Sequence, residues 1–396
     1  MAIREVKLGK VATVKGGKRL PKGINLITKP NPHPYIRVRD LNGKKTLELD
    51  GSFEFVDDET QKAISRYIVT GGDIVLSIVG TIGLVSVVGD SLNEANLTEN
   101  CVKLTSLSGI DRDYLYYYLK SSYGQQEIAR GTVGAVQAKL PIKNIQDISI
   151  PLPDEVTQRK IADILSSLDA KIEVNQRIND NLYEIVNAYY TSLFKDVECE
   201  MTTIGNYAER IYSGGTPTTS NAAYWDGTFG WFSSGETRNR FVISTEKSIT
   251  QTGIDNSSTK LASKHDIVMA SAGQGFTRGQ TSMLLIDTYV NQSVIVIHAD
   301  RNILPYLFWN LANRSEELRA ISDSSSIRGS LTTKMIAAFE IPCANNDVIQ
   351  TFSGFAWAVI PQIENNLLEN ERLAALRDSL LPKLMTGEID VSAIQL

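Results

Sequence analysis

KIEVNQRINDNL, residues 171–182, lies in the middle of a long segment with the pattern of an amphipathic helix. Asp154 has the right chemistry and place for a helix N-cap. After it, apolar residues recur in a 3–4 alternation at positions 161, 165, 168, 172, 182, 186, 189 and 193. Asn175 and Asn179 occupy the two remaining positions of this heptad series. The segment therefore predicts a long helix whose apolar face is interrupted by two amides.

The chain contains an internal repeat. Three pairs of segments resemble each other in the same order: 72–88 and 265–284, 113–122 and 305–314, 142–153 and 333–344. The repeat pairs Asp73 with Asp266, Tyr114 with Tyr306, and Pro151 with Pro342, at offsets of 193, 192 and 191. Such nearly constant offsets predict two copies of one unit, each ending in a long helix.

The second long helix carries asparagines in the same positions as the first. Adding 191 to the first series gives Phe352, Ala356, Val359, Ile363, Asn366, Asn370, Leu373, Arg377, Leu380 and Leu384. A helix of about 40 residues would span about 60 Å. We expect Pro361 to kink or restart this helix. In an antiparallel pair the four amides would meet near the midpoint and could fix the register. The alternative is a solvated seam.

Within each copy, short β-branched runs stopped by glycine, such as DIVLSIVG and DIVMASAG, predict strands. Residues 113–130 and 305–321 predict helices with aromatic inner faces. Each copy therefore fits an α+β globule of roughly 150 residues.

Composition indicates a soluble protein of more than one domain. The chain has 396 residues, 42% of them apolar and 21% charged, with a net charge of −5. There is no apolar leader or membrane-length run, so we expect a cytoplasmic protein. The widely spaced Cys101, Cys199 and Cys343 predict reduced thiols, not disulfides or a zinc site.

The first 45 residues hold twelve Lys and Arg residues opposed by two acids. This basic segment is either a solvated face or a nucleic-acid contact.

The search for catalytic chemistry is negative. NPHPY (31–35) is similar to the N-P-P-Y motif of amino-methyltransferases, but His33 separates the prolines, and we interpret it as a stiff loop. The G-x-G in SAGQGFTRG is followed by a strand-like run and not by a helix, so it is a weak dinucleotide signal. A phosphate-binding G-x-x-x-x-G-K-[ST] motif is absent, and the three histidines have no metal-ligand spacing. We therefore predict no catalytic residue, metal or cofactor in this chain.

Polar, Gly-rich loops occur in both copies and suit contact with DNA. Their backbone amides can approach phosphates, while Arg, Asn and Gln can pair with base edges. The candidate DNA-binding residues in the first copy are Lys15, Lys18, Arg19, Lys22, Arg37, Arg39, Gln137 and Lys139. Those in the second copy are Ser213, Thr216, Arg238, Asn239, Arg240, Gln274, Thr277, Arg278 and Arg328. Each residue taken alone fits an ordinary exposed loop residue better than a DNA contact. The prediction rests on equivalent loops being polar and Gly-rich in both copies.

Three segments resemble the DNA-specificity (S) subunit of type I restriction-modification systems. YSGGTPTTSNAAYWDGTFGWFSSGE (212–236) is similar to the start of a target-recognition domain. IPLPDEVTQRKIADILSSLDAKIEVNQRIN (150–179) is similar to the central conserved helix, and ERLAALRDSLLPKLMTGEIDV (371–391) to the C-terminal conserved segment. The resemblance covers essentially the whole chain.

The resemblance implies an α+β fold of two tandem α/β-mixed target-recognition domains, with two long antiparallel coiled-coil helices between them and a pseudo-two-fold. The expected segments are domain 1 (1–153), the central spacer helix (154–196), domain 2 (197–344) and the C-terminal spacer helix with its tail (345–396). It also implies that each domain reads one half of a split DNA site. From the expected helix lengths we predict that the two helices act as a ruler between the half-sites.

The expected partners are double-stranded DNA, two modification (methyltransferase) subunits, and restriction subunits that translocate and cut DNA. S-adenosylmethionine, ATP and Mg are expected in those partners and not in this chain. Two other functions stay open: a duplicated protein–protein scaffold that does not bind DNA, and a self-contained DNA methyltransferase.

Overall fold

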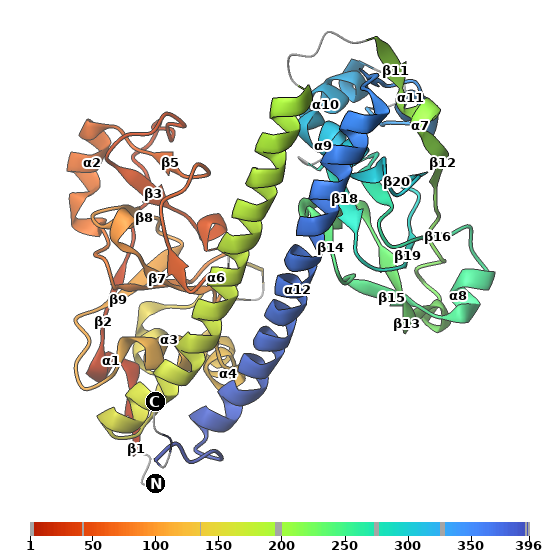
Figure 1. Ribbon diagram of the computed structural model, residues 1–396. Coiled ribbons are helices and arrows are strands. Elements are labelled where there is room, and N and C mark those ends of the chain that lie inside the picture. Colours follow the sequence, from red (N-terminus) through yellow and green to blue (C-terminus); the bar gives the residue numbers. More distant parts are fainter. Residues whose placement is uncertain are drawn as a thin grey trace. The chain divides into compact units, whose positions relative to one another are not determined.

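The chain folds into two compact units that share two long helices (Figure 1). The computed structural model describes residues 4–41, 43–134, 136–194, 200–272, 277–324, 329–392 and 394. Unit 1 comprises Met1–Glu173 and Arg372–Leu396, and unit 2 comprises Val174–Glu371. Helices α6 (Glu155–Phe194) and α12 (Asn346–Met385) each contribute one part to each unit. The two expected boundaries at residues 153/154 and 344/345 fall immediately before these helices, while each compact unit also takes in part of both.

Unit 1 is built on a five-stranded sheet of order β2-β9-β6-β7-β4, in which only the β4–β7 pair is parallel. Its strands are β2 (Thr13–Gly16), β4 (Thr46–Leu47), β6 (Ile74–Ser77), β7 (Val85–Val88) and β9 (Cys101–Thr105). A second sheet, β5-β3-β8, consists of β3 (Pro34–Ile36), β5 (Glu54–Phe55) and β8 (Asn96–Leu97), and β1 (Arg4–Lys7) pairs with β10 (Ser149–Leu152). The helices are α1 (Leu8–Val11), α2 (Asp58–Ile64), α3 (Arg112–Lys120), α4 (Ser122–Gly131) and α5 (Ile142–Gln146), with 3-10 turns η1 (Val38–Asp40), η2 (Ser65–Tyr67) and η3 (Asp90–Leu92).

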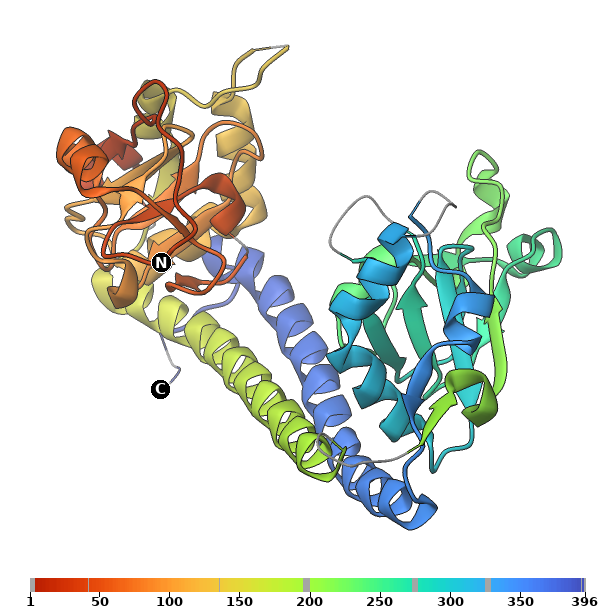
Figure 2. The same cartoon turned by 90° about the horizontal axis from the view of Figure 1, so that it is seen from above.

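Unit 2 repeats this plan with one more strand in its second sheet. Its strands and short helices are drawn in green to blue in Figure 2. Its five-stranded sheet has the order β12-β20-β17-β18-β14, with β12 (Ala208–Ser213), β14 (Phe241–Val242), β17 (Ile267–Ala270), β18 (Thr281–Leu284) and β20 (Val294–Ala299). The second sheet, β15-β13-β19-β16, consists of β13 (Trp225–Phe232), β15 (Lys247–Ile249), β16 (Lys260–Ala262) and β19 (Thr288–Val290), and β11 (Met201–Thr203) pairs with β21 (Glu340–Pro342). The helices are α7 (Ile204–Tyr207), α8 (Gln251–Asp255), α9 (Leu304–Asn313), α10 (Ser315–Ser324) and α11 (Thr333–Ala337), with 3-10 turns η4 (Ala222–Tyr224) and η5 (Ser234–Arg238).

Residues at equivalent positions of the repeat make the same contact in both units. The Tyr114 hydroxyl donates to the Pro151 carbonyl at 2.6 Å, and the Tyr306 hydroxyl donates to the Pro342 carbonyl at 2.6 Å. Each of these bonds ties the helix after the main sheet to the last strand of its unit. The duplicated α+β fold predicted from the sequence is therefore confirmed.

In each unit the helix pair following the main sheet lies where the aromatic pattern predicts. Tyr114, Tyr116, Tyr117 and Tyr118 of α3 are buried, and Trp309 of α9 is fully buried. Trp309 stacks on Tyr183 of α6 at 5.7 Å and meets Phe352 of α12 edge-on at 5.8 Å. The aromatic inner faces thus pack against the long helices, which accounts for their burial.

Helix α6 starts as predicted, because Asp154 Oδ1 accepts a hydrogen bond from the Thr157 amide at 2.9 Å. The expected restart of the second helix at Pro361 is wrong, since α12 is helical without interruption from Asn346 to Met385. Ile360 and Ile363, on either side of the proline, are each 1% exposed. The packing of these two side chains stabilises the helix at the point where Pro361, which has no backbone N–H, cannot donate a hydrogen bond. Neither these two helices nor any other in the described ranges combines the length and apolarity needed to cross a membrane.

Candidate nucleic-acid interface

One end of the five-stranded sheet of unit 1 gathers four loops. Strands β2 and β6 end there and β9 begins there, because β9 runs antiparallel to both. The Gly17 amide donates to the Cys101 carbonyl at 3.0 Å, and the Ile78 amide to the Asn100 carbonyl at 2.8 Å. The Leu140 amide donates to the Ile78 carbonyl at 3.0 Å, which adds the 132–140 loop to the group. We call this group the loop end of unit 1.

Unit 2 has an equivalent loop end. The Gly214 and Gly215 amides donate to the Asn291 and Val290 carbonyls at 3.3 and 3.1 Å, beside the start of β20. The Leu331 amide donates to the Ser271 carbonyl at 2.8 Å, as Leu140 does to Ile78 in unit 1. The loops that begin after β2 and β12, and the segments that end at Leu140 and Leu331, therefore reach the same place in each unit.

The loop end of unit 1 is rich in exposed cations. Its exposed candidates are Lys15, Lys18, Arg19, Lys22, Gln137 and Lys139. Arg19 is ion-paired with Glu99 at 3.0 Å, but its side chain is 83% exposed, so it can still exchange this partner for a phosphate. Lys18 Nζ lies 5.5 Å from the centre of the Tyr67 ring. This end of unit 1 therefore carries a local positive charge that the net charge of the chain conceals.

Arg37 and Arg39 lie instead in an ion-pair cluster with two acids. Arg37 pairs with Glu54, while Arg39 lies 3.4 Å from Asp40 and 3.2 Å from Glu54. Asp40 is 6% exposed and accepts a hydrogen bond from the Arg37 amide at 2.7 Å, which caps η1. Burial raises the pKa of the Asp40 carboxyl to about 6 despite the opposing effect of Arg39. Both guanidinium charges are thus compensated within the protein.

In its described residues, the loop end of unit 2 is polar and carries little free charge. Ser213 and Thr277 are partly buried, and the Thr216 hydroxyl donates to the Gln292 side chain. The Arg278 guanidinium is 14% exposed because it bonds Asp323 and the Gly329 carbonyl. Gln274 and Arg328 lie outside the described residues. Contacts from the described residues of this end would therefore depend on amides and hydroxyls more than on charge.

The 238–240 segment follows η5 and makes different contacts. Arg238 pairs with Glu246 and also donates to the Gly235 carbonyl at 3.1 Å, while Asn239 is exposed. Arg240 lies over the Tyr183 ring of α6 at 4.1 Å and 3.8 Å from Asp180. Arg240 is therefore placed against the long helix within unit 2 by a cation–π contact.

Beneath each loop end, a buried aromatic side chain donates a hydrogen bond to the loop backbone. The Tyr35 hydroxyl donates to the Lys18 carbonyl at 2.7 Å in unit 1. The Trp231 indole donates to the Gly215 carbonyl at 3.3 Å in unit 2. Neither residue was predicted from the sequence to have this role, although Tyr35 is the last residue of NPHPY. The rest of that motif forms a loop in which Asn31 Oδ1 accepts from the His33 amide at 2.8 Å.

The four asparagines of the long helices meet as two pairs within unit 2. Asn175 Nδ2 donates to Asn370 Oδ1 at 2.9 Å, and Asn366 Nδ2 donates to Asn179 Oδ1 at 2.8 Å. Glu369 and Gln362 extend the network, at 2.7 Å from Asn175 and 2.8 Å from Asn366. Within the described chain Asn175 Oδ1 is buried without a partner, so the network is not completely satisfied. The two pairs require α6 and α12 to run antiparallel here.

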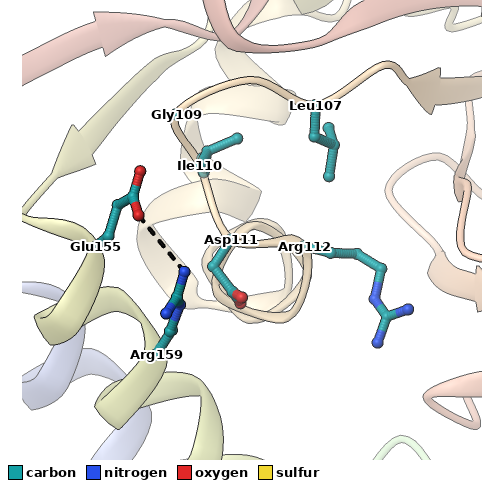
Figure 3. Close-up of a pocket in the computed structure, with 7 residues that line it drawn as sticks. All are labelled: Leu107, Gly109, Ile110, Asp111, Arg112, Glu155 and Arg159. Atoms are coloured by element: carbon teal, nitrogen blue, oxygen red, sulfur yellow. Dashed lines mark hydrogen bonds and ion pairs between the residues drawn. The ribbon is translucent and has the colours of Figure 1, made fainter.

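A pocket and two cysteines are further possible sites among the residues that the structure describes. Figure 3 shows a pocket of about 260 Å³ in unit 1, lined by Leu107, Gly109, Ile110, Asp111, Arg112, Glu155 and Arg159. Its charged groups are engaged: Asp111 caps α3, Arg112 bonds Asp113 at 2.7 Å, and Arg159 pairs with Glu155 at 3.5 Å. Among the described residues, no three His, Cys, Asp or Glu side chains are grouped to hold a metal ion. Cys101 and Cys343 are free thiols, and Cys199 lies outside the described residues.

Comparison with known proteins explains the duplicated architecture. The family model for the type I restriction modification DNA specificity domain matches residues 3–184 and again 197–347. The chain belongs to this family. Each match contains one five-stranded sheet and its loop end, and the resemblance found in the sequence is confirmed.

Individual relatives are distant in sequence. The chain is 22% identical to the HindI type I restriction enzyme specificity subunit of Haemophilus influenzae, over 63% of this chain and 71% of that protein. It is 20% identical to the MjaIX specificity subunit of Methanocaldococcus jannaschii, over 91% of this chain and 88% of that protein. A crystal structure of the type I S subunit from M. genitalium shares the fold, with a TM-score of 0.58 and 17% identity over 97% of this chain and 96% of that one.

Proposed function

We propose that this chain reads a bipartite DNA site for a type I restriction-modification complex, with one half-site read by the loop end of each unit. The observation that carries this proposal is the equivalence of the two loop ends, which present Gly-rich loops at the same end of the same sheet. Membership of the DNA specificity family supports the DNA target. Two copies of one reading surface suit a site made of two separated halves.

The two loop ends would contribute differently to binding. Exposed Lys18, Lys22 and Lys139 in unit 1 suit contacts to phosphates, which supply affinity and make binding sensitive to salt. In unit 2 the hydroxyl and amide groups suit base edges, where each good bidentate contact contributes roughly 1–3 kcal/mol of discrimination. The net charge of −5 suggests that partner subunits complete the positively charged channel around DNA.

Partner subunits would supply the chemistry. We propose that two modification subunits bind S-adenosylmethionine and methylate adenine, and that restriction subunits use ATP and Mg to translocate and cut DNA. This chain would serve as their scaffold and contribute no catalytic group. Relatives carrying the name of type I specificity subunits support this assignment.

The long helices would set the distance between the half-sites. Each has 40 residues, and an α-helix of that length spans about 60 Å. Sites read on one face of B-DNA are separated by about 34 Å or a multiple of it. A four-residue insertion in both helices should therefore change the number of unread base pairs and leave the two half-site sequences unchanged. Unchanged spacing would exclude the helices as the ruler.

A gel-shift titration tests the proposal against its alternatives. The chain is assembled with its modification subunits and titrated against DNA with and without the methylated motif of the host. We expect salt-sensitive, sequence-specific binding by the complex and weak binding by the isolated chain. An ordered complex without DNA binding would support a protein–protein scaffold instead. Methyl transfer by the isolated chain with S-adenosylmethionine would identify a self-contained methyltransferase.

A further inference from the structure

The two aromatic donors beneath the loop ends occupy equivalent positions in the repeat. Tyr35 precedes Ile36, which pairs in parallel with Leu97 of β8, and Trp231 precedes Phe232, which pairs in parallel with Val290 of β19. Both rings are buried, at 3% and 5% exposure. Their acceptors, Lys18 and Gly215, both directly follow the first glycine of the loop after the first strand of the main sheet. Two different side chains thus provide one hydrogen bond at one place.

We propose that Tyr35 and Trp231 are positioning residues that hold the DNA-reading loop of their unit in its binding conformation. The proposal rests on the proposed function and adds to it the residues that fix the geometry of each reading loop. Neither side chain would touch DNA, because both are buried beneath the loop. Each would act through the carbonyl it binds and so through the exposed side chains that follow.

A close backbone approach also holds the start of each loop. A Cβ added to Gly17 would lie 2.0 Å from the Thr98 carbonyl oxygen, and one added to Gly214 would lie 1.9 Å from the Val290 oxygen. Glycine is therefore required at both positions by space alone. The backbone contact and the aromatic donor together clamp the start of the loop, so the exposed side chains that follow start from a fixed backbone position.

Unit 2 adds a second indole to the clamp. Trp225 Nε1 donates to the Thr218 carbonyl at 3.2 Å, and the Trp225 ring meets Trp231 edge-on at 5.0 Å. The two indoles bind carbonyls at both ends of the 215–218 segment, which contains the candidate Thr216. This second support fits a loop that would read DNA through short polar side chains, since such side chains tolerate less displacement of the backbone than lysine does.

Loss of one donor should loosen one loop and leave the other intact. A hydrogen bond of this kind changes an equilibrium by about two- to tenfold. We therefore expect Tyr35→Phe to lower discrimination within the unit 1 half-site by about that factor and to leave the unit 2 half-site unchanged. Trp231→Phe should have the converse effect. Each variant thus carries its own internal reference in the half-site of the other unit.

The test is sequencing of methylated adenines after expression of the complete system with each variant. Tyr114→Phe and Tyr306→Phe are matched controls, because each removes a buried hydroxyl that donates to a backbone carbonyl at 2.6 Å. Neither of these carbonyls belongs to a reading loop. Melting temperatures of the assembled methyltransferase should fall similarly for Tyr35→Phe and Tyr114→Phe, but only Tyr35→Phe should relax a half-site.

Relaxation of both half-sites, or of neither, would overturn the positioning role. Tyr35→Phe preserves the ring, so it decides the question even if the larger change Trp231→Phe prevents folding. Failure of the proposed function can be distinguished from failure of the positioning role, because in that case the wild-type system would show no bipartite methylation motif. A wild-type bipartite motif combined with an unchanged half-site in Tyr35→Phe would reject the positioning role alone.

Discussion

Asn366 donates a hydrogen bond to Asn179 across 2.8 Å between α12 and α6, and both side chains are more than nine-tenths buried. Asn175 and Asn370 form the second pair at 2.9 Å. The repeat offset of 191 carries Asn175 onto Asn366 and Asn179 onto Asn370, so it converts each pair into the other. Displacing one helix by a turn would leave buried amides unpaired, at a cost of roughly 1–3 kcal/mol for each amide. We interpret the two pairs as a register lock.

Replacing Asn175, Asn179, Asn366 and Asn370 together with Leu should raise the stability of the protein and weaken the control of helix register. We expect the melting temperature to rise, because a buried Leu side chain contributes about 1.5–3 kcal/mol. The spacing between half-sites should become heterogeneous, since a polar residue in a helical seam specifies register at a cost in stability. Methylated-adenine sequencing reports the spacing.

The control for this variant is Asn181→Leu with Asn365→Leu, which changes two exposed asparagines on the same helices. It should preserve both stability and spacing. A single unchanged spacing in the quadruple variant would argue against the lock.

In unit 1 the same two helices are joined by an ion pair. Arg377 Nη1 lies 2.6 Å from Asp169 Oδ1, and the Tyr117 hydroxyl donates to Asp169 Oδ2 at 2.5 Å. Arg377→Leu should lower the free energy of unfolding by about 2–3 kcal/mol, because it leaves the Asp169 carboxylate without its cation. Adding Asp169→Leu should restore most of the loss. Denaturation of the variants against the exposed control Arg372→Leu measures both steps, and equal stability of Arg377→Leu and the control would refute the prediction.

The exposed lysines of unit 1 should control the salt dependence of DNA binding. Lys18→Ala with Lys22→Ala should lower the slope of log affinity against log salt by about 2, since each phosphate contact contributes about 0.9. Arg39→Ala is the control, because Asp40 and Glu54 already compensate its charge. Filter binding of the assembled complex over a range of salt concentrations tests this. Identical slopes for wild type and the double variant would place the phosphates elsewhere.

The buried Asp40 predicts a pH dependence. Burial raises its pKa from 3.8 to about 6, so the folded protein binds more protons than the unfolded chain between these values. Stability should therefore fall as pH rises through this window and should level off above it. Asp40→Asn, which can still accept from the Arg37 amide, should lack this decline. Melting temperatures of both proteins from about pH 4 to about pH 7 make the comparison, and parallel curves would contradict it.

Periodicity and repeat matching predicted much of the fold because each depends on local sequence. The strands β6 and β17, the aromatic helices and the Asp154 cap were all predicted. So were the equivalent positions of Tyr114 and Tyr306, whose hydrogen bonds are now seen. The part of the Pro361 prediction that expected a restart was wrong, because tertiary packing of Ile360 and Ile363 outweighs one missing hydrogen bond.

The candidate interface was harder to predict, because the availability of a cation depends on neighbours that are distant in sequence. Arg278 is engaged by Asp323, and Arg240 by Tyr183, and neither partner lies near its arginine in the chain. A sequence pattern shared by the two copies could have pointed to the positioning role of Tyr35 and Trp231. In both copies the aromatic residue is followed by an apolar one and, five positions on, by a buried acid, Asp40 or Glu236.

The central claim is that each unit reads its own half of a split DNA site. Sequencing of methylated adenines in cells expressing the complete system tests it most directly, when wild type is compared with a variant in which the unit 1 loop Lys18–Lys22 is replaced. We predict a bipartite motif with a fixed gap, in which this replacement changes one half and leaves the gap and the other half intact. A contiguous motif, or simultaneous change in both halves, would contradict the claim.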